Sequence, residues 1–291
     1  RTKAALESAQ ANPLSSFNDS VTVTLIGNHP RRILMQPEMV DQLDYNKMMA
    51  FYKDRFADAG DFTFFLVGNL DIEAMKPLIA QYLGSLPAID RKESWRDNNI
   101  EYRKGNILNE YAKEQETPMA TIAMMYTGKC KYTLKNNILM SMLNQAFDMV
   151  FTEEIREKEG GTYGVSCAGQ IEKLPREEFI MQVVYQTDPA KKDHLNGIID
   201  KLVAQMAAEG PSEENLAKIK EYMLKTFKDN QKENGYWLNN LVEYYSNGID
   251  RTKDYEAIVN GITVKDIQKF ANSLFKQGNK ATIIMTVPEE N

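Results

Sequence analysis

Few residues of this sequence have side chains that commonly bind metals or act as nucleophiles. The 291 residues include two histidines, His29 and His194, and two cysteines, Cys130 and Cys167. Two cysteines so far apart form neither a C-x-x-C metal site nor a disulfide framework. Cys167 lies in a run of alternating apolar residues, and we predict a half-buried free thiol. His194 lies in a charged helical stretch and His29 in a turn, so we expect an exposed His194 and a local hydrogen bond at His29 rather than metal binding.

A second group of residues, Arg156-Glu-Lys-Glu-Gly-Gly-Thr-Tyr163, combines a cation, two glycines and a phenol within eight positions. From the residues alone, a structural interpretation is complete. Arg156 lies near the end of a helix, where the helix dipole favours a cation, and Glu153 is three residues before it. The two glycines end the helix, and Tyr163 follows as a strand residue with its ring in the core.

The composition excludes several classes of function. Hydrophobic residues make up 43% and charged residues 26% of the chain, which is ordinary for a protein with a sizeable core. The net charge of −6 leaves no basic surface to replace the counterions of a nucleic acid, so we expect no nucleic-acid partner. The longest apolar run, residues 119–126, is too short to cross a membrane, and we see no signal segment at the start.

The first part of the chain alternates between helical and strand patterns. Residues 1–12 are typical of the end of a helix, whereas residues 13–32 fit a strand and a helix equally well. An apolar face from Tyr45 to Phe56 predicts a helix, and residues 62–67 predict a buried strand. Asp71 is a suitable N-cap for a further helix, which is expected to bury Ile72, Met75, Leu78, Ile79 and Tyr82.

A charged stretch, residues 91–105, is the best linker candidate before a second group of elements. Apolar periodicity there predicts four strands and four helices. The predicted strands are residues 119–126, 162–170, 179–185 and 281–287, and the predicted helices are residues 134–158 and 264–275, with two more on either side of Gly210-Pro211-Ser212.

The chain also contains an internal repeat. Residues 39–67 align without a gap with residues 258–286, at an offset of 219 residues (258 − 39). Phe51 falls on Phe270 and Phe56 on Phe275, and both stretches predict a turn, an amphipathic helix, a polar turn and a strand. The offset predicts a structural unit of about 220 residues. We therefore predict that residues 1–90 are the second half of one unit, residues 91–105 a linker, and residues 106–291 nearly all of the next unit.

Several motifs together resemble the pitrilysin/insulinase family of zinc metallopeptidases, the inverzincins, and in particular their C-terminal, non-catalytic half. The most specific is the segment from Arg156 to Tyr163. The others are Asn28-His29-Pro30, Tyr52-Lys-Asp-Arg-Phe56, Phe62-Thr-Phe-Phe-Leu-Val-Gly-Asn69, Tyr82-Leu-Gly-Ser-Leu-Pro87 and Gly210-Pro-Ser-Glu-Glu-Asn-Leu216. The resemblance implies an α+β fold of repeated units, each a mainly antiparallel sheet with helices packed on one face.

The resemblance also implies where the zinc is bound. In the family, an H-x-x-E-H motif on a helix of the N-terminal half holds zinc, and its glutamate activates water. This sequence has no such motif. The helix in the equivalent place, residues 134–158, carries Asn144, Gln145 and Asp148 but no histidine. We therefore expect no metal in this segment and zinc in the N-terminal part of a longer parent.

By the same resemblance, Arg156 and Tyr163 project toward the active site and contact the backbone of an extended peptide substrate. A guanidinium and a phenol can donate hydrogen bonds to a carbonyl oxygen as it becomes an oxyanion. The implied partner is the N-terminal catalytic half, and the implied location is the bacterial periplasm or cell envelope. Two alternatives stay open: a catalytically inactive scaffold or binding subunit of the same family, and an unrelated structural α+β domain.

Overall fold

The computed structural model describes residues 1–162 and 164–288. The chain folds into two compact units, each built from separate segments of sequence. Unit 1 contains residues 1–7, 35–97 and 228–251, and unit 2 contains residues 8–34, 98–227 and 252–291. The predicted division at residues 90 and 105 concerns sequence repeats and stays a prediction.

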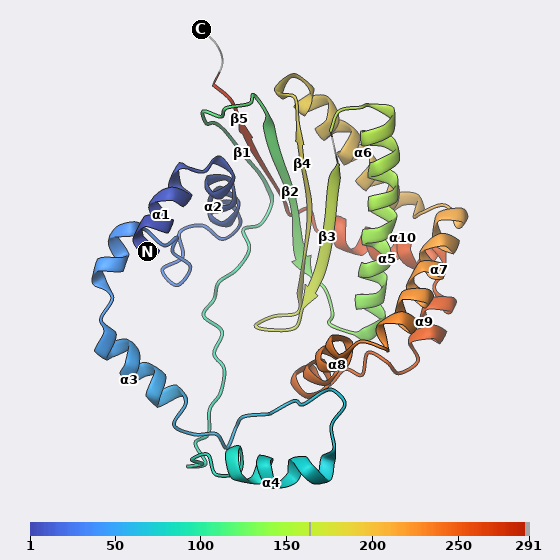
Figure 1. Ribbon diagram of the computed structural model, residues 1–291. Coiled ribbons are helices and arrows are strands. Elements are labelled where there is room, and N and C mark those ends of the chain that lie inside the picture. The colour runs from blue at the N-terminus through green and yellow to red at the C-terminus, as the bar shows by residue number, and fades with distance from the viewer. Residues whose placement is uncertain (163, 289–291) are drawn as a thin grey trace. The chain divides into compact units, whose positions relative to one another are not determined.

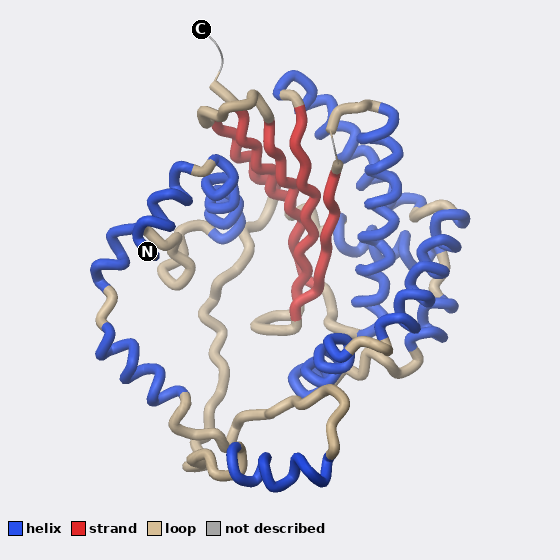
Figure 2. The backbone as a smooth tube through the Cα atoms, viewed as in Figure 1, coloured by secondary structure: helices blue, strands red, loops and turns tan. Residues whose placement is uncertain are grey.

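Unit 2 is built on a five-stranded mixed sheet, shown in red in Figure 2. The strand order is β1-β5-β2-β4-β3, with β1 and β5 parallel and all other neighbours antiparallel. The predicted mainly antiparallel sheet is therefore confirmed. The strands are β1 (Asn106–Ala112), β2 (Ala120–Lys129), β3 (Val165–Glu172), β4 (Glu178–Thr187) and β5 (Lys280–Thr286). The first of these, β1, lacks a clear sequence pattern and was not predicted.

Helices cover one face of this sheet and enclose the main core (Figure 1). The amphipathic helix α10 buries Ile267, Phe270 and Leu274, and the long helix α5 buries Leu143 and Phe147. These side chains fill the space above the sheet and exclude water, which is the main source of the unit's stability. The helices of this layer are α5 (Leu134–Phe151), α6 (Lys192–Glu209), α7 (Glu213–Asn230), α9 (Tyr255–Gly261) and α10 (Val264–Phe275), with short turns η2 (Thr152–Lys158) and η3 (Pro189–Lys191).

One helix, α2 (Pro13–Ile26), covers the other face of the sheet. Phe17 and Leu25 are buried in a second, smaller cluster with strand residues of β2 and β5, including Met125 and Ile283. The side chain of Asn12 caps the helix by accepting hydrogen bonds from the next turn. The ambiguous stretch at residues 13–32 is thus mainly helical, because an apolar helical face finds a sheet to cover. It follows the predicted helix at residues 1–12, which is α1 (Thr2–Ala11).

Unit 1 contains α3 (Tyr45–Arg55), α4 (Ile72–Tyr82), α8 (Asn234–Asn247) and the 3-10 turn η1 (Pro37–Gln42). The predicted N-cap is confirmed, since Asp71 accepts hydrogen bonds from the amides of Glu73 and Ala74. The predicted burial is wrong for α4, whose apolar residues Ile72 and Tyr82 are exposed. Apart from Pro37, the described residues of this unit bury no apolar side chain.

The strand predicted at residues 62–67 is also wrong. These residues form no strand, and the side chains of Phe62, Phe64 and Leu66 are exposed. A strand is stabilised by backbone hydrogen bonds to a neighbour, and the described part of unit 1 contains no strand to provide one. The alternating pattern of the sequence predicts how the segment would pair, but not whether a partner is present.

Unit 1 contains a buried carboxylate that joins the end of α3 to residues 89–91. Asp58 accepts hydrogen bonds from the backbone amides of Gly60, Ile89 and Arg91, at 2.9, 3.0 and 2.6 Å. These amides, first that of Gly60, hold the pKa of Asp58 below its usual value. Arg91 also pairs with Asp54. The beginning of the predicted linker is thus attached to the end of α3.

Within the described residues, no helix combines the length and the apolar character needed to span a bilayer.

Candidate substrate-contacting site

The candidate site begins where α5 ends. After Phe151, α5 continues as the π-helical segment η2. The helix predicted at residues 134–158 is therefore α-helical in its first part and π-helical in its last. Isolated π-helical turns occur often at functional sites. Within η2, Ile155 is fully buried and fixes the segment to the core, whereas the next residue, Arg156, is exposed.

Arg156 has no partner among the described residues. Two acidic side chains that precede it on η2 are paired with another cation, since Lys158 lies 3.1 Å from Glu153 and 2.6 Å from Glu154. The expected neighbour of Arg156 is therefore already neutralised. The guanidinium keeps its five N–H donors for solvent or a ligand, in the fork geometry that suits carbonyl and carboxylate oxygens.

The two glycines hold the chain close to α6, as the turn of the motif requires. Gly160 adopts a φ of +54°, in the left-handed region that glycine enters at little cost. A Cβ at Gly161 would lie 2.7 Å from Cδ1 of Leu195, which is fully buried. The hydroxyl of Thr187 donates to the Gly161 carbonyl and fixes the turn to the end of β4. The predicted helix stop is confirmed, and the turn at Gly161 is attached to α6 and to the end of β4.

Tyr163, the other predicted contact residue, lies outside the described residues. On either side of it, the Thr162 hydroxyl and the backbone of Gly164 are hydrogen-bonded to each other, and β3 begins at Val165. Its role beside Arg156 therefore stays a prediction.

The structure adds a residue pair that sequence reasoning did not place here. His194, at the start of α6, is exposed as expected, but its Nε2 lies 2.9 Å from Oε2 of Glu159, within the Arg156–Tyr163 segment. No sequence signal links the two, because they are 35 positions apart. His29 makes the predicted local bond, accepting from the amide of Arg31 through Nδ1.

Polar side chains of α5, the helix expected to lack zinc ligands, form hydrogen bonds to a neighbouring strand. Asn144 donates to the carbonyl of Gly169 at 2.9 Å, and Asp148 accepts from the amide of Cys167 at 3.2 Å. These two side chains, one helical turn apart on α5, bond the backbone of the edge strand β3. Burial raises the pKa of Asp148, against the opposing effect of the Cys167 amide. In the part of the chain that is described, no three histidine, cysteine or acidic side chains gather as a metal site would require.

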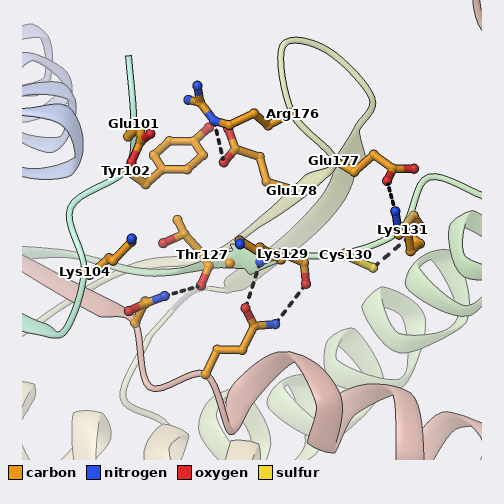
Figure 3. Close-up of a pocket in the computed structure, with 13 residues that line it drawn as sticks. Glu101, Tyr102, Lys104, Thr127, Lys129, Cys130, Lys131, Arg176, Glu177 and Glu178 are labelled. Atoms are coloured by element: carbon orange, nitrogen blue, oxygen red, sulfur yellow. Dashed lines mark hydrogen bonds and ion pairs between the residues drawn. The ribbon is translucent and has the colours of Figure 1, made fainter. Parts of the chain in front are cut away.

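A cavity of about 840 Å³ lies at the other end of the sheet, and Figure 3 shows the residues that line it. It is lined by Glu178 at the start of β4, whereas Arg156 belongs to the turn fixed at the end of β4, roughly 30 Å away along a ten-residue strand. Several of its polar side chains are paired within the protein: Gln277 bonds both the amide and the carbonyl of Lys129. Lys131 pairs with Glu177 at 2.6 Å. The cavity is therefore a structural junction and not part of the candidate site.

The surroundings of both cysteines disfavour the reactive thiolate form. Burial, and then the charge of Glu177, raises the pKa of Cys130 to about 11, so the thiol stays protonated at neutral pH. Cys167 is buried, more deeply than the predicted half-buried position, and its pKa is raised for the same reason.

Comparison with known proteins places the chain in a family. A family model described as the peptidase M16 inactive domain matches residues 42–223. A probable zinc protease of Escherichia coli K12, PqqL, is 24% identical over 215 residues, covering 73% of this chain and 23% of that protein.

Two solved structures have the same fold. The periplasmic protease PqqL from E. coli aligns with a TM-score of 0.84 at 20% identity, covering 98% of this chain and 32% of that one. The first half of the same protease aligns with a TM-score of 0.75 at 18% identity, covering 99% of this chain and 64% of that one. The chain thus spans about a quarter of the curated relative and a third of the solved protease. The resemblance seen in the sequence is confirmed: the chain belongs to the peptidase M16 inactive-domain family, the non-catalytic part of pitrilysin-type zinc proteases.

Proposed function

We propose that this chain is the non-catalytic part of a zinc-dependent metalloendopeptidase, and that it supplies Arg156 and Tyr163 to an active site completed by an N-terminal catalytic half. The observation that carries the proposal is the state of Arg156: exposed, without a partner among the described residues, and fixed in place by Ile155 and the glycine turn. An exposed cation without a partner, on a backbone anchored by Ile155 and the glycine turn, suits an external anionic or carbonyl ligand.

The chemistry follows from the two side chains. During peptide cleavage the scissile carbonyl oxygen gains negative charge, and N–H or O–H donors already aimed at it lower the energy of that state. Closure over an extended peptide excludes water and orients the substrate. Zinc would be bound by the catalytic half, because Asn144 and Asp148 are already hydrogen-bonded to β3 and do not suit a metal.

The location and the parent are part of the same proposal. The solved relative is a periplasmic protease, and its chain is about three times as long as this one. We extend both properties to the parent of this chain: a periplasmic or envelope protease in which this region follows the catalytic half.

The central test is Arg156→Ala in the full-length protease. Loss of one oxyanion donor reduces kcat by about 100- to 1,000-fold, and Arg156→Lys recovers little because the two-pronged guanidinium is lost. Tyr163→Phe, which removes only the hydroxyl, tests the second donor. Arg103→Ala, which removes another exposed arginine of unit 2, is the control and leaves kcat unchanged.

A mixing experiment separates the enzyme from the scaffold alternative. We expect residues 1–291 alone to have no peptidase activity and to bind no stoichiometric zinc, and we expect activity to appear when the catalytic half is added. Stable association without any activity supports the scaffold. Full activity of both Arg156→Ala and Tyr163→Phe would remove the proposed role.

A further inference from the structure

The segment that carries Arg156 contains more carboxylates than cations. Residues 152–159, Thr-Glu-Glu-Ile-Arg-Glu-Lys-Glu, include four glutamates against one arginine and one lysine. A guanidinium in such a segment is expected to pair with a carboxylate, because long side chains about one helical turn apart lie close together. Arg156 nevertheless pairs with none of the described residues. The partners of the nearby carboxylates explain why.

Two of the four carboxylates are held by Lys158. Its Nζ lies 3.1 Å from Oε1 of Glu153 and 2.6 Å from Oε1 of Glu154. The hydrogen bonds to these carboxylates, first that to Glu154, raise the pKa of Lys158, so the ammonium stays charged at neutral pH. Both carboxylates on the N-terminal side of Arg156 therefore have a cation of their own.

Of the other two carboxylates, that of Glu159 is the one within reach of the guanidinium. Glu159 lies three residues after Arg156, whereas Glu157 directly follows it, and adjacent residues on a helix do not face each other. Oε2 of Glu159 lies 2.9 Å from Nε2 of His194, near the start of α6. Since an ionised carboxylate only accepts hydrogen bonds, this ring nitrogen carries the hydrogen. The contact holds the Glu159 carboxylate at α6.

The backbone of His194 is fixed by its neighbours on α6. The next residue, Leu195, is fully buried, and a Cβ at Gly161 would lie 2.7 Å from its Cδ1. Two residues earlier, Lys192 pairs with Glu110 of β1 at 2.8 Å. The first turn of α6 is thus joined both to the sheet and to the glycine turn of the Arg156 segment, so the imidazole can hold a side chain of that segment in place.

We infer that His194 is a positioning residue that keeps Glu159 from pairing with Arg156, so that the guanidinium stays available to a ligand. This role rests on the function proposed for Arg156. Without the imidazole, Arg156 is the cation that the sequence places about one turn from Glu159, since Lys158 already holds two carboxylates. Exposed ion pairs favour the paired form by a factor of about two to five. A ligand would then have to displace Glu159 before it could bind.

The first test measures how available the guanidinium is. Phenylglyoxal modifies unpaired arginine side chains, and mass spectrometry of the full-length protease gives the rate of modification at Arg156. We expect this rate to fall by about two- to fivefold in His194→Ala, the range set by the strength of exposed ion pairs. In His194→Gln, which keeps an N–H donor, we expect a rate close to that of the parent. Arg103, another exposed arginine, is the reference within each sample.

A second substitution separates competition for Arg156 from general support of the segment. Glu159→Gln removes the competing charge, so we expect no effect alone and a return to the parent rate in His194→Ala/Glu159→Gln. If the contact only supported the segment, the double variant would stay as slow as His194→Ala. Lys218→Ala is the control: it frees the carboxylate of an exposed ion pair on α7, that with Glu214, and leaves the rate at Arg156 unchanged.

Peptidase activity of the same variants tests the proposed function separately. We expect kcat to fall in His194→Ala and to recover in His194→Ala/Glu159→Gln, in step with the rate of modification. Unchanged modification of Arg156 in His194→Ala, or a double variant that stays slow, would overturn the inference. Modification rates that change as expected without any change in kcat would support the role of His194 and overturn the role proposed for Arg156.

Discussion

Arg156 and Gly161, both near the end of the same helix, differ in their surroundings. The arginine is exposed and has no partner among the described residues, whereas the glycine is pressed against Leu195 of α6 and held by Thr187. The glycine turn anchors the backbone that carries the arginine. Less conformational entropy of that backbone is therefore lost when a ligand binds.

Gly161→Ala tests that rigidity. Its Cβ would lie 2.7 Å from a methyl group of a fully buried leucine, so we expect a loss of about 1–3 kcal/mol from overpacking. The control is Gly197→Ala in α6, where a Cβ meets nothing within 4 Å, and where we expect a gain of about 0.5–1 kcal/mol. Chemical denaturation of both variants gives the comparison. Equal stability of the two would contradict the close contact.

At the scale of residues, the sequence predicted contacts between neighbouring residues better than contacts between residues distant in sequence. The local bond of His29 and the helix stop at Gly160 follow from nearby residues and were predicted. The contact of His194 with Glu159, and the use of Asp148 to hold β3, join residues distant in sequence. Such contacts depend on how helices pack on the sheet, which no local pattern records.

At the scale of elements, residues 62–67 expose apolar side chains at alternate positions on one side, as in a strand, but the prediction of a buried strand was wrong. Residues 62–67 have the same pattern as β5, and only β5 has neighbours. The converse occurred at residues 13–32, where an ambiguous pattern became α2 because its apolar side faces the sheet. Around the candidate site the order of elements was better predicted, since a helix, a glycine pair and a strand follow one another in sequence, while the roles of Arg156 and Tyr163 stay predictions.

The attachment between α3 and residues 89–91 should respond to acid. The pKa of Asp58 is lower folded than unfolded, so its contribution to stability is fully present above the unfolded value, about 3.9. That contribution is lost as the pH falls through the lower, folded pKa. Asp58→Asn should therefore weaken the protection of the amides of Ile89 and Arg91 near neutral pH, and this difference from the parent should shrink below pH 4.

Hydrogen exchange from pH 3 to pH 7, corrected for intrinsic rates, measures this difference. As a control, Asp71→Asn keeps an N-cap side chain on α4 and should leave residues 89–91 unaffected. A difference for Asp58→Asn that stayed constant across the range would mean that the carboxylate does not titrate as proposed.

At the scale of the whole molecule, the two units differ in how they are stabilised. Unit 2 contains every buried hydrophobic side chain of the described residues other than a proline, whereas unit 1 relies on polar contacts such as those of Asp58. Burial of apolar area contributes about 25 cal/mol per Å², so a unit without it is weakly stable. The repeat indicated two units, but not their interleaved composition, which depends on long-range packing.

We therefore expect limited proteolysis of residues 1–291 to cut first within residues 62–97, while unit 2 stays intact. Local opening of unit 1 costs little free energy, so cleavage there follows its open population. Mass spectrometry of the first fragments identifies the sites. First cuts within the strands of unit 2 would contradict this order.

The position of β5 also has a consequence for how the protein is made. This strand lies between β1 and β2, and the backbone of Gly105, just before β1, bonds the side chain of Asn279 from 174 positions away. During synthesis β1 and β2 leave the ribosome long before the strand that joins them. Contacts so distant in sequence form slowly. Until residues 280–286 emerge, β1 lacks the neighbour it has in the folded sheet, and we expect its edge to be open to pairing with other chains during synthesis.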